Sequence, residues 1–456
     1  MGGGIARAFR RFVAADSSVQ VIVAGLALAI YLQGAYYGWA QLVVTVILFA
    51  GMLLLPRLPE FRREDLPVVL AAAGFAGWAV VDGVLKHEPG AGVRYALLVA
   101  AVVVFAGCCR ELRGGARTDL VRRLIIVCCL VAALGWVGVV AHHGTWGFES
   151  PGLWRASSTL TYPNATAALL AIAGLVCLAV RARDPEVRLL GVAATALLTG
   201  LAATLSRAGL LAFGVGAVVL VVGVGWRPVV RVALAPVLGT GVAMAGLVPS
   251  ITADAPTVTT VAVAAVAALA GLGIGCLTAT PRAVPIVPVV GVAVAVIAAN
   301  TTSFGSRFTF DSPDRWDSIR AAWQLFTENP LTGVGPGLTR LVVERTRGGA
   351  GVYRYVHNEY LQVLTELGVI GGVLLVAFLV TAARRLYRPR PDAYAFGVLA
   401  ATAALVVHAG FDFVWHIPAI PLYLAALIGL ALPYSPAEQE QTATSSPAKN
   451  TERSTT

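Results

Sequence analysis

The chain has 456 residues, of which 57% are hydrophobic and only 13% charged, and its formal net charge is +10. Apolar runs of about 20 residues follow one another along most of its length, which is what helices crossing a hydrocarbon core of roughly 30 Å require. The sequence therefore predicts an all-α, polytopic membrane bundle. Its basic residues lie mostly in short connections between apolar runs, so the charge reflects membrane topology and predicts no nucleic-acid partner.

Hydropathy predicts about 12–14 transmembrane helices. The candidate spans cover residues 19–32, 39–55, 68–85, 95–109, 124–141, 165–180, 189–203, 209–224, 230–248, 258–277, 284–299, 360–381, 396–409 and 419–432. These runs form one membrane domain over residues 1–434. Residues 435–456 are a polar, low-complexity run that cannot bury enough apolar surface to fold, so a disordered tail is expected there.

Arginine placement predicts the orientation. The N-terminal lead MGGGIARAFRRFV is basic and amphipathic, and every second connection after it is basic too. Because short arginine-rich loops stay in the cytoplasm, this alternation predicts both termini inside and an even number of spans. The same parity predicts four outer segments, which hold most of the unusual polar residues: 142–164, the 206–207 turn, 301–357 and 411–418.

The outer segment 301–357 is the largest polar island in the chain. Ser312, Pro313 and Asp314 are typical of a helix start, and Asn329-Pro330 of its end. Between them one apolar stripe is expected, consisting of Trp316, Ile319, Trp323 and Phe326. Such a helix suits the membrane interface, where Arg315 and Arg320 would in the simplest interpretation contact lipid phosphates.

A glycine-rich turn, LTGVGPGLTRL, follows this helix. It has no preceding strand, so it is weak evidence for nucleotide binding. Close backbone packing or a hinge is the expected role of Gly333, Gly335 and Gly337.

The next helix begins near His357 and enters the membrane. Asn358, Gln362 and Glu366 recur every four residues and form a polar stripe on its outer turns. Polar groups at that depth must face protein or a water-filled cavity, so they indicate either a functional site or hydrogen bonds between helices.

Two other outer connections carry unusual groups. Arg207 lies between two apolar runs with almost no loop around it, so its permanent charge needs an anion or water. The link VVHAGFDFVWHIP carries His408, Asp412 and His416 at four-residue spacing. This spacing suggests a metal pair, but Pro418 interrupts the helix and no HExxH pattern is present, so a supporting or packing role fits better.

Several motifs together resemble the O-antigen ligase and polymerase superfamily. The carriers are SRAG opening a span, the outer pattern SRF…DRW…AAW…NPLTGVGPG, HNEYLQVLTELGVIGG, WRASSTLTYPNATAALLA and HAGFDFVWHIP, which together cover residues 155–421. The resemblance implies a glycosyltransferase that uses a polyprenyl-diphosphate-linked glycan donor on the outer face, with a glycan, lipid or protein acceptor. It implies no metal, nucleotide or other cofactor.

The resemblance also implies roles for individual residues. Arg207 and Arg315 would bind the donor diphosphate, and His357 would take the acceptor proton or orient the acceptor. Arg307 competes with Arg315 for its role, because the SRF and DRW motifs lie close together. Further substrate contacts are expected from Arg155, Asn358, Glu366 and Asp412.

Two other classes of protein remain as alternatives. A transporter or flippase would also place polar groups in spans, but near the midplane and often with internal repeats. A structural membrane subunit would not need Arg207, Arg315 and His357 on one face. The sequence does not separate a ligase from a polymerase.

Overall fold

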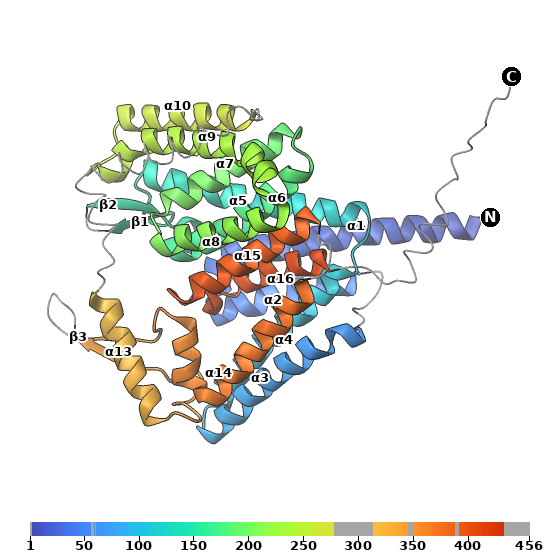
Figure 1. Cartoon of the computed structure of the whole chain (residues 1–456), viewed down its shortest axis with the longest axis vertical. Helices are drawn as coiled ribbons and strands as arrows, with labels where there is room; N and C mark the ends of the chain where they lie inside the picture. The colour runs from blue at the N-terminus through green and yellow to red at the C-terminus, as the bar shows by residue number, and fades with distance from the viewer. Residues whose placement is uncertain are drawn as a thin grey trace.

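The computed structural model describes residues 2–55, 59, 61–150, 152–277, 313–344, 350–387 and 392–432. These residues form a helical bundle with two small hairpins (Figure 1). Eight described helices are long and apolar enough to cross a membrane, and five shorter apolar helices accompany them. The polytopic all-α fold is thus confirmed. The candidate span 284–299, Arg307 and the tail 435–456 lie outside the described residues.

Each predicted span among the described residues overlaps a helix, and several helices begin earlier than predicted, α1 at Gly2 and α5 at Gly115. Their bounds are α1 Gly2–Tyr31, α2 Gly38–Leu53, α3 Leu66–Leu85, α4 Pro89–Arg110, α5 Gly115–Val140, α6 Pro163–Arg183, α7 Arg188–Ala203, α8 Arg207–Val224, α9 Trp226–Thr252, α10 Val258–Gly275, α13 Pro313–Glu328, α14 Glu359–Leu386, α15 Ala393–Ala409 and α16 Ala419–Ala431. The hairpins are β1 Gly147–Ser150 with β2 Leu153–Ala156, and β3 Leu341–Glu344 with β4 Ala350–Tyr353. Short 3-10 turns include η3 Ser158–Leu160 and η5 Val414–His416.

Helix α6 forms the centre of the bundle. It is buried along almost its whole length, and α7, α8 and α15 pack around it. Its sequence is rich in alanine, and small residues let helix backbones approach closely where lipid provides no hydrophobic drive for association. This central position explains why α6 can hold the residues at its N-terminus in a fixed place.

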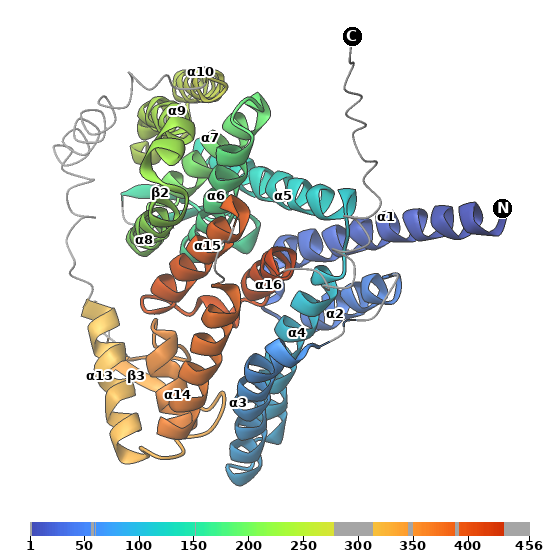
Figure 2. The same cartoon turned by 45° about the vertical axis from the view of Figure 1, so that its right-hand side comes forward.

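Helix α14 lies beside α3, which pairs with α4, and α13 packs against α14 on the side away from α3 (Figure 2). The inner face of α13 buries Ser318 and Ala322, and Ala322 packs in a cluster with Leu341 and Leu361. Trp316 and Trp323 are more than half exposed on its other face. The helix predicted between Pro313 and Asn329 is therefore present, and its tryptophans face away from the protein.

Helix α14 is broken at Gly368, whose φ of 64° is left-handed. The preceding carbonyls of Thr365 and Glu366 accept hydrogen bonds from the amides of Val334 and Gly335. On the far side of the break, the amides of Val369 and Ile370 donate to the carbonyls of Pro330 and Leu331. The glycine-rich turn after α13 thus satisfies the backbone groups freed by the break, as apolar surroundings require.

Two clusters of polar side chains lie at opposite ends of α14. At its C-terminal end, Arg385 contacts the Asp65 carboxylate at 2.7 Å, and Arg110 contacts it at 2.6 Å. These three residues come from connections that the arginine pattern predicts on the inner side. At the N-terminal end of α14, segments predicted on the outer side meet instead.

Candidate functional site

Asp412 is the centre of the outer grouping. Its carboxylate is fully buried in the loop between α15 and η5. His357 Nδ1 lies 3.0 Å from one carboxylate oxygen, and the guanidinium of Arg315 lies 3.6 Å from the other. Three predicted site residues, from three separate segments, are therefore brought together.

Two residues near the start of α6 complete the surroundings of Asp412. The Tyr162 hydroxyl donates to the carboxylate at 2.7 Å, and the Asn164 amide donates to the same oxygen. Arg155, on β2, donates to the Asn164 side-chain oxygen at 3.3 Å and to the Thr204 carbonyl at 2.9 Å. Arg155 therefore joins the α7–α8 turn to the Asp412 site.

The charges around Asp412 keep its carboxylate ionised. Burial by itself would raise the pKa of Asp412, but the hydrogen bond with His357, the charge of Arg315 and the Tyr162 hydroxyl together hold this pKa well below its ordinary value. Burial and the Asp412 charge also raise the pKa of the Tyr162 hydroxyl, so Tyr162 acts as a neutral donor. An ionised carboxylate only accepts hydrogen bonds, so His357 donates through Nδ1 and Nε2 is the nitrogen available to exchange a proton.

The acid is buried, but its partners His357 and Arg315 are accessible. The Asp412 side chain is 0% exposed, His357 is 22% exposed and Arg315 is 34% exposed. A buried anion that anchors two accessible donors is suited to receiving an anionic ligand, because the donors are oriented before the ligand arrives.

Arg207 begins α8, directly after the N-cap Ser206, and is half-buried. The turn before it includes Thr204, whose carbonyl accepts the hydrogen bond from Arg155. Arg207 is thus placed on a connection that is bonded to the Asp412 surroundings.

Left-handed backbone conformations border the site. Thr161, Leu205 and His357 have φ values of 56°, 50° and 54°. Thr161 precedes Tyr162, Leu205 lies two residues before Arg207, and His357 is itself a site residue. Non-glycine residues in this region store strain that persists only where neighbouring structure imposes it. The conformation supports a functional role for these three junctions.

Asn358 and Glu366 have partners within the protein. Asn358 is the N-cap of α14, and its side-chain oxygen accepts from the Leu361 amide at 3.0 Å. The Glu366 carboxylate is buried and accepts four hydrogen bonds, from the Tyr95 hydroxyl, the Gly337 amide, the Thr339 hydroxyl and the Gln362 amide. Both expected substrate contacts therefore have structural bonds, and Arg307 lies outside the described residues.

The residues of the HAGFDFVWHIP link point to different partners. His408 is buried in the last turn of α15, Asp412 turns to His357, and His416 turns to Glu359 at 2.9 Å. Among the described residues, no group of three or more ligand-type side chains has the arrangement of a metal site. The four-residue spacing fails to align them because α15 ends at Ala409.

The sequence did not single out several residues of this site. The sequence predicts no role for Tyr162, Glu359, Tyr355 or Phe413, and Asn164 appears only as part of a motif. Phe413 stacks between the rings of Tyr162 at 5.2 Å and Tyr355 at 4.7 Å. The YPN and HNEY motifs carried the only available signal for Tyr162 and Glu359.

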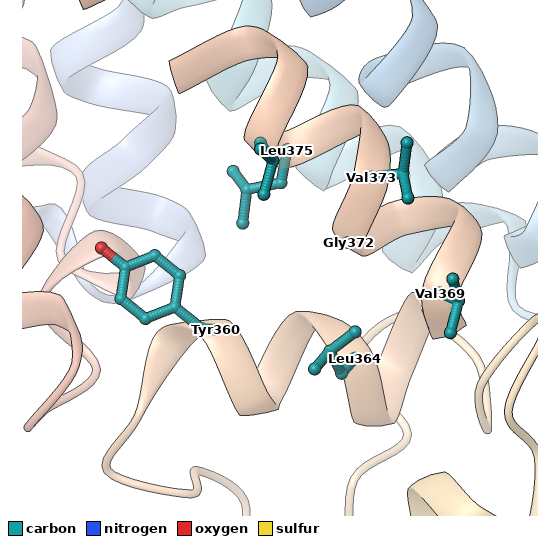
Figure 3. A pocket seen from close by; sticks show the side chains of 7 residues that line it. Tyr360, Leu364, Val369, Gly372, Val373 and Leu375 are labelled. Atoms are coloured by element: carbon teal, nitrogen blue, oxygen red, sulfur yellow. The ribbon is translucent and has the colours of Figure 1, made fainter. Parts of the chain in front are cut away.

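An apolar hollow of about 310 Å³ lies in the bend of α14 (Figure 3). Tyr360 and Leu364 line it before the break, and Val369, Val373 and Leu375 line it after the break. Tyr360 follows His357 by three residues, so the hollow adjoins the segment that carries the site histidine.

The fold and site define a multi-pass membrane protein with a buried acid that orients accessible cations at one end of the bundle. Residues 191–376 match the family model described as O-Antigen ligase. The match supports the resemblance of the motifs to the O-antigen ligase superfamily. It likewise supports a similarity to O-antigen ligase-like membrane glycosyltransferases. It covers Arg207, Arg315 and His357 and ends before Asp412. No curated protein matches the chain significantly.

Proposed function

We propose that this protein transfers or polymerises a glycan from a polyprenyl-diphosphate donor on the outer face of the membrane. The single observation that carries the proposal is the contact of His357 and Arg315 with the buried Asp412 carboxylate. The segments that meet there are those that the arginine pattern predicts outside, which supports an extracytoplasmic site.

The proposed reaction needs a place for negative charge and a place for a proton. The acceptor oxygen attacks the anomeric carbon of the glycan, the bond from that carbon to the diphosphate oxygen breaks, and its electron pair leaves on the diphosphate. Arg315, Arg207 and Arg155 are the proposed partners of this charge, because guanidinium groups bind phosphate oxygens in pairs and stay charged. His357 Nε2 would take the acceptor proton, with Asp412 holding the ring in the required tautomer.

The bent helix offers a place for the donor's hydrocarbon chain. The hollow beside Tyr360 and Leu364 is apolar and adjoins the site segment. A chain that enters it would lie beside lipid-facing surface while its diphosphate end reaches the cations.

The test is turnover of a polyprenyl-diphosphate-linked oligosaccharide by purified protein in lipid, with EDTA present and a cell-envelope extract as acceptor. Wild type is compared with Arg207→Ala, Arg315→Ala and His357→Ala, and with Arg320→Ala as a control whose side chain is 78% exposed on the same helix as Arg315. Transfer by wild type and the control but not by the three variants supports the proposal, and product length distinguishes a ligase from a polymerase. Movement of the intact donor between leaflets, without cleavage, would instead identify a flippase.

A further inference from the structure

The segment that carries His357 and the loop that carries Asp412 are joined twice, in opposite directions. His357 reaches from the α14 segment to Asp412 on the loop, at 3.0 Å. His416 reaches from the loop back to Glu359 at the start of α14, at 2.9 Å. We propose that Glu359 and His416 are a positioning pair for the glycosyl transfer, holding His357 against Asp412; this inference rests on the proposed function.

Glu359 contacts the backbone of the loop as well as the His416 side chain. Its side chain is only 1% exposed, and one carboxylate oxygen also accepts hydrogen bonds from the backbone amides of Trp415 and His416. The carboxylate therefore fixes the backbone of η5, which directly follows Asp412 and Phe413. We expect loss of the carboxylate charge to weaken the hold of α14 on this loop.

The surroundings of His416 favour its charged form. Nδ1 faces the Glu359 carboxylate, and Nε2 lies 3.4 Å from the Tyr95 hydroxyl oxygen. The Tyr95 proton is donated to Glu366 at 2.6 Å, so the oxygen of Tyr95 is free to accept. Both ring nitrogens thus lie near oxygen atoms, and the negative charge of Glu359 at ion-pair distance favours an imidazolium over a neutral ring.

Aromatic rings connect the two histidine–carboxylate pairs. The Tyr355 ring lies 4.7 Å from the His416 ring and 4.7 Å from the Phe413 ring. Phe413 in turn lies 5.1 Å from His357. A shift of His416 therefore reaches the His357 ring through packed side chains.

The backbone of His357 shows why a second pair is needed. Its φ of 54° is strained for a histidine and persists only where several contacts impose it. The bond to Asp412 fixes the side chain, and the Glu359–His416 pair fixes the two backbones on either side. Without the Glu359–His416 pair, we expect His357 to relax away from Asp412 and lose the alignment that proton transfer needs.

The inference is tested with Glu359→Gln, His416→Gln and the double variant in the transfer assay. Each single variant should lower kcat by about 10²-fold, as expected for a misplacement near 1 Å, and leave the KM for the donor unchanged, because Arg315 is intact. The double variant should lose no more than the worse single variant, because the two residues act as one unit. Single variants with wild-type kcat, or losses that multiply, would overturn the inference.

A second readout does not depend on turnover. Carbethoxylation of His357 by diethyl pyrocarbonate, followed by mass spectrometry of the folded protein, should become several-fold faster in both single variants, because the ring leaves Asp412. The exposed His143, stacked on Trp146 elsewhere on the surface, serves as the internal control. An unchanged rate at His357 would contradict the positioning role, whereas absence of transfer by wild type would contradict only the proposed function.

Discussion

Two buried aspartates, one at each end of α14, each contact two basic side chains. Asp65 is bound by Arg110 and Arg385 at 2.6 and 2.7 Å, and these arginine side chains are only 2% and 8% exposed. Asp412 is bound by His357 and Arg315 at 3.0 and 3.6 Å, and these partners are 22% and 34% exposed. The acids are alike, but their partners are not.

This difference separates a structural cluster from a candidate site. At Asp65 both arginines are paired within the protein, because Arg110 also contacts Glu111 and Arg385 also contacts Glu64, each at 3.5 Å. The cluster ties α3, α4 and α14 together. At Asp412 the side chains of His357 and Arg315 keep accessible surface and lie farther from the carboxylate, so they can exchange part of their interaction for a ligand. Exposure of the basic side chains, rather than burial of the acid, is what distinguishes the candidate site from the structural cluster.

The largest expected effect is on catalysis at the Asp412 end. His357→Ala should lower kcat by about 10²- to 10⁴-fold, because it removes the group proposed to accept the proton. The matched change His143→Ala, at an exposed histidine outside the site, should leave kcat unchanged. Steady-state transfer rates check this, and equal rates for wild type and His357→Ala would remove His357 from the reaction.

At the other end, Asp65→Asn should affect stability alone. The change leaves Arg110 and Arg385 buried without their carboxylate, which should cost about 3–5 kcal/mol of unfolding free energy. The control Asp392→Asn breaks an exposed ion pair with Arg183 and should cost less than about 1 kcal/mol. Reversible unfolding in mixed detergent measures both losses of stability. A lower kcat per folded molecule of Asp65→Asn would contradict the purely structural role of Asp65.

Filling the hollow in the bend of α14 should have a moderate effect. Leu364→Trp should raise the KM for a long-chain donor about tenfold, because roughly two methylene groups of the chain would no longer be buried. The KM for a short-chain donor should not change. Ile126→Trp, on the exposed face of α5, is the control. An equal rise for both donors would indicate that the hydrocarbon chain lies elsewhere.

The smallest effect is a pH dependence of opposite sign for the two site pairs. Burial lowers the pKa of His416, but the charges of Glu359 and Glu366 raise it by more than burial lowers it. The net pKa is therefore above the ordinary 6.5. Stabilisation by this pair is therefore complete below pH 6.5 and is lost as the pH rises through the raised value. The pKa of Asp412 is lowered, so its stabilisation is present above its ordinary pKa of 3.8 and is lost as the pH falls through the lowered value.

Melting temperatures across this range test the sign of the His416 contribution. The difference between wild type and His416→Gln should be largest at and below pH 6.5 and should shrink as the pH rises through the raised pKa of His416. A difference that grows with pH would show that His416 is neutral in the folded protein.

Much of the architecture could be predicted from the sequence because apolar length and arginine placement act locally. The α13 helix was predicted from Pro313 and Asn329-Pro330, and thirteen candidate spans correspond to described helices, the eight long and five shorter ones. The break at Gly368 was not predicted. A glycine in a span is ordinary, and only the turn that supplies hydrogen bonds to Thr365 and Glu366 makes the break possible.

The site was predicted in part for a similar reason. His357, Arg315 and Asp412 are unusual residue types for their positions, so the sequence identified them separately. Their contacts join residues 55 apart or more in the chain, which no local pattern encodes. Glu359 was missed because an acid in the first turn of a helix is common, and its partnership with His416 depends on the fold.

Binding of a glycan-free polyprenyl diphosphate to purified protein in lipid tests the central claim most directly. Arg315→Ala should weaken this binding about 10- to 100-fold, the loss of a charge-assisted contact with phosphate, and Arg320→Ala on the same helix should bind like wild type. Equal affinities for wild type and Arg315→Ala, or equal losses in both variants, would mean that Arg315 is a general contact to lipid phosphates and that the cations around Asp412 are not the donor site.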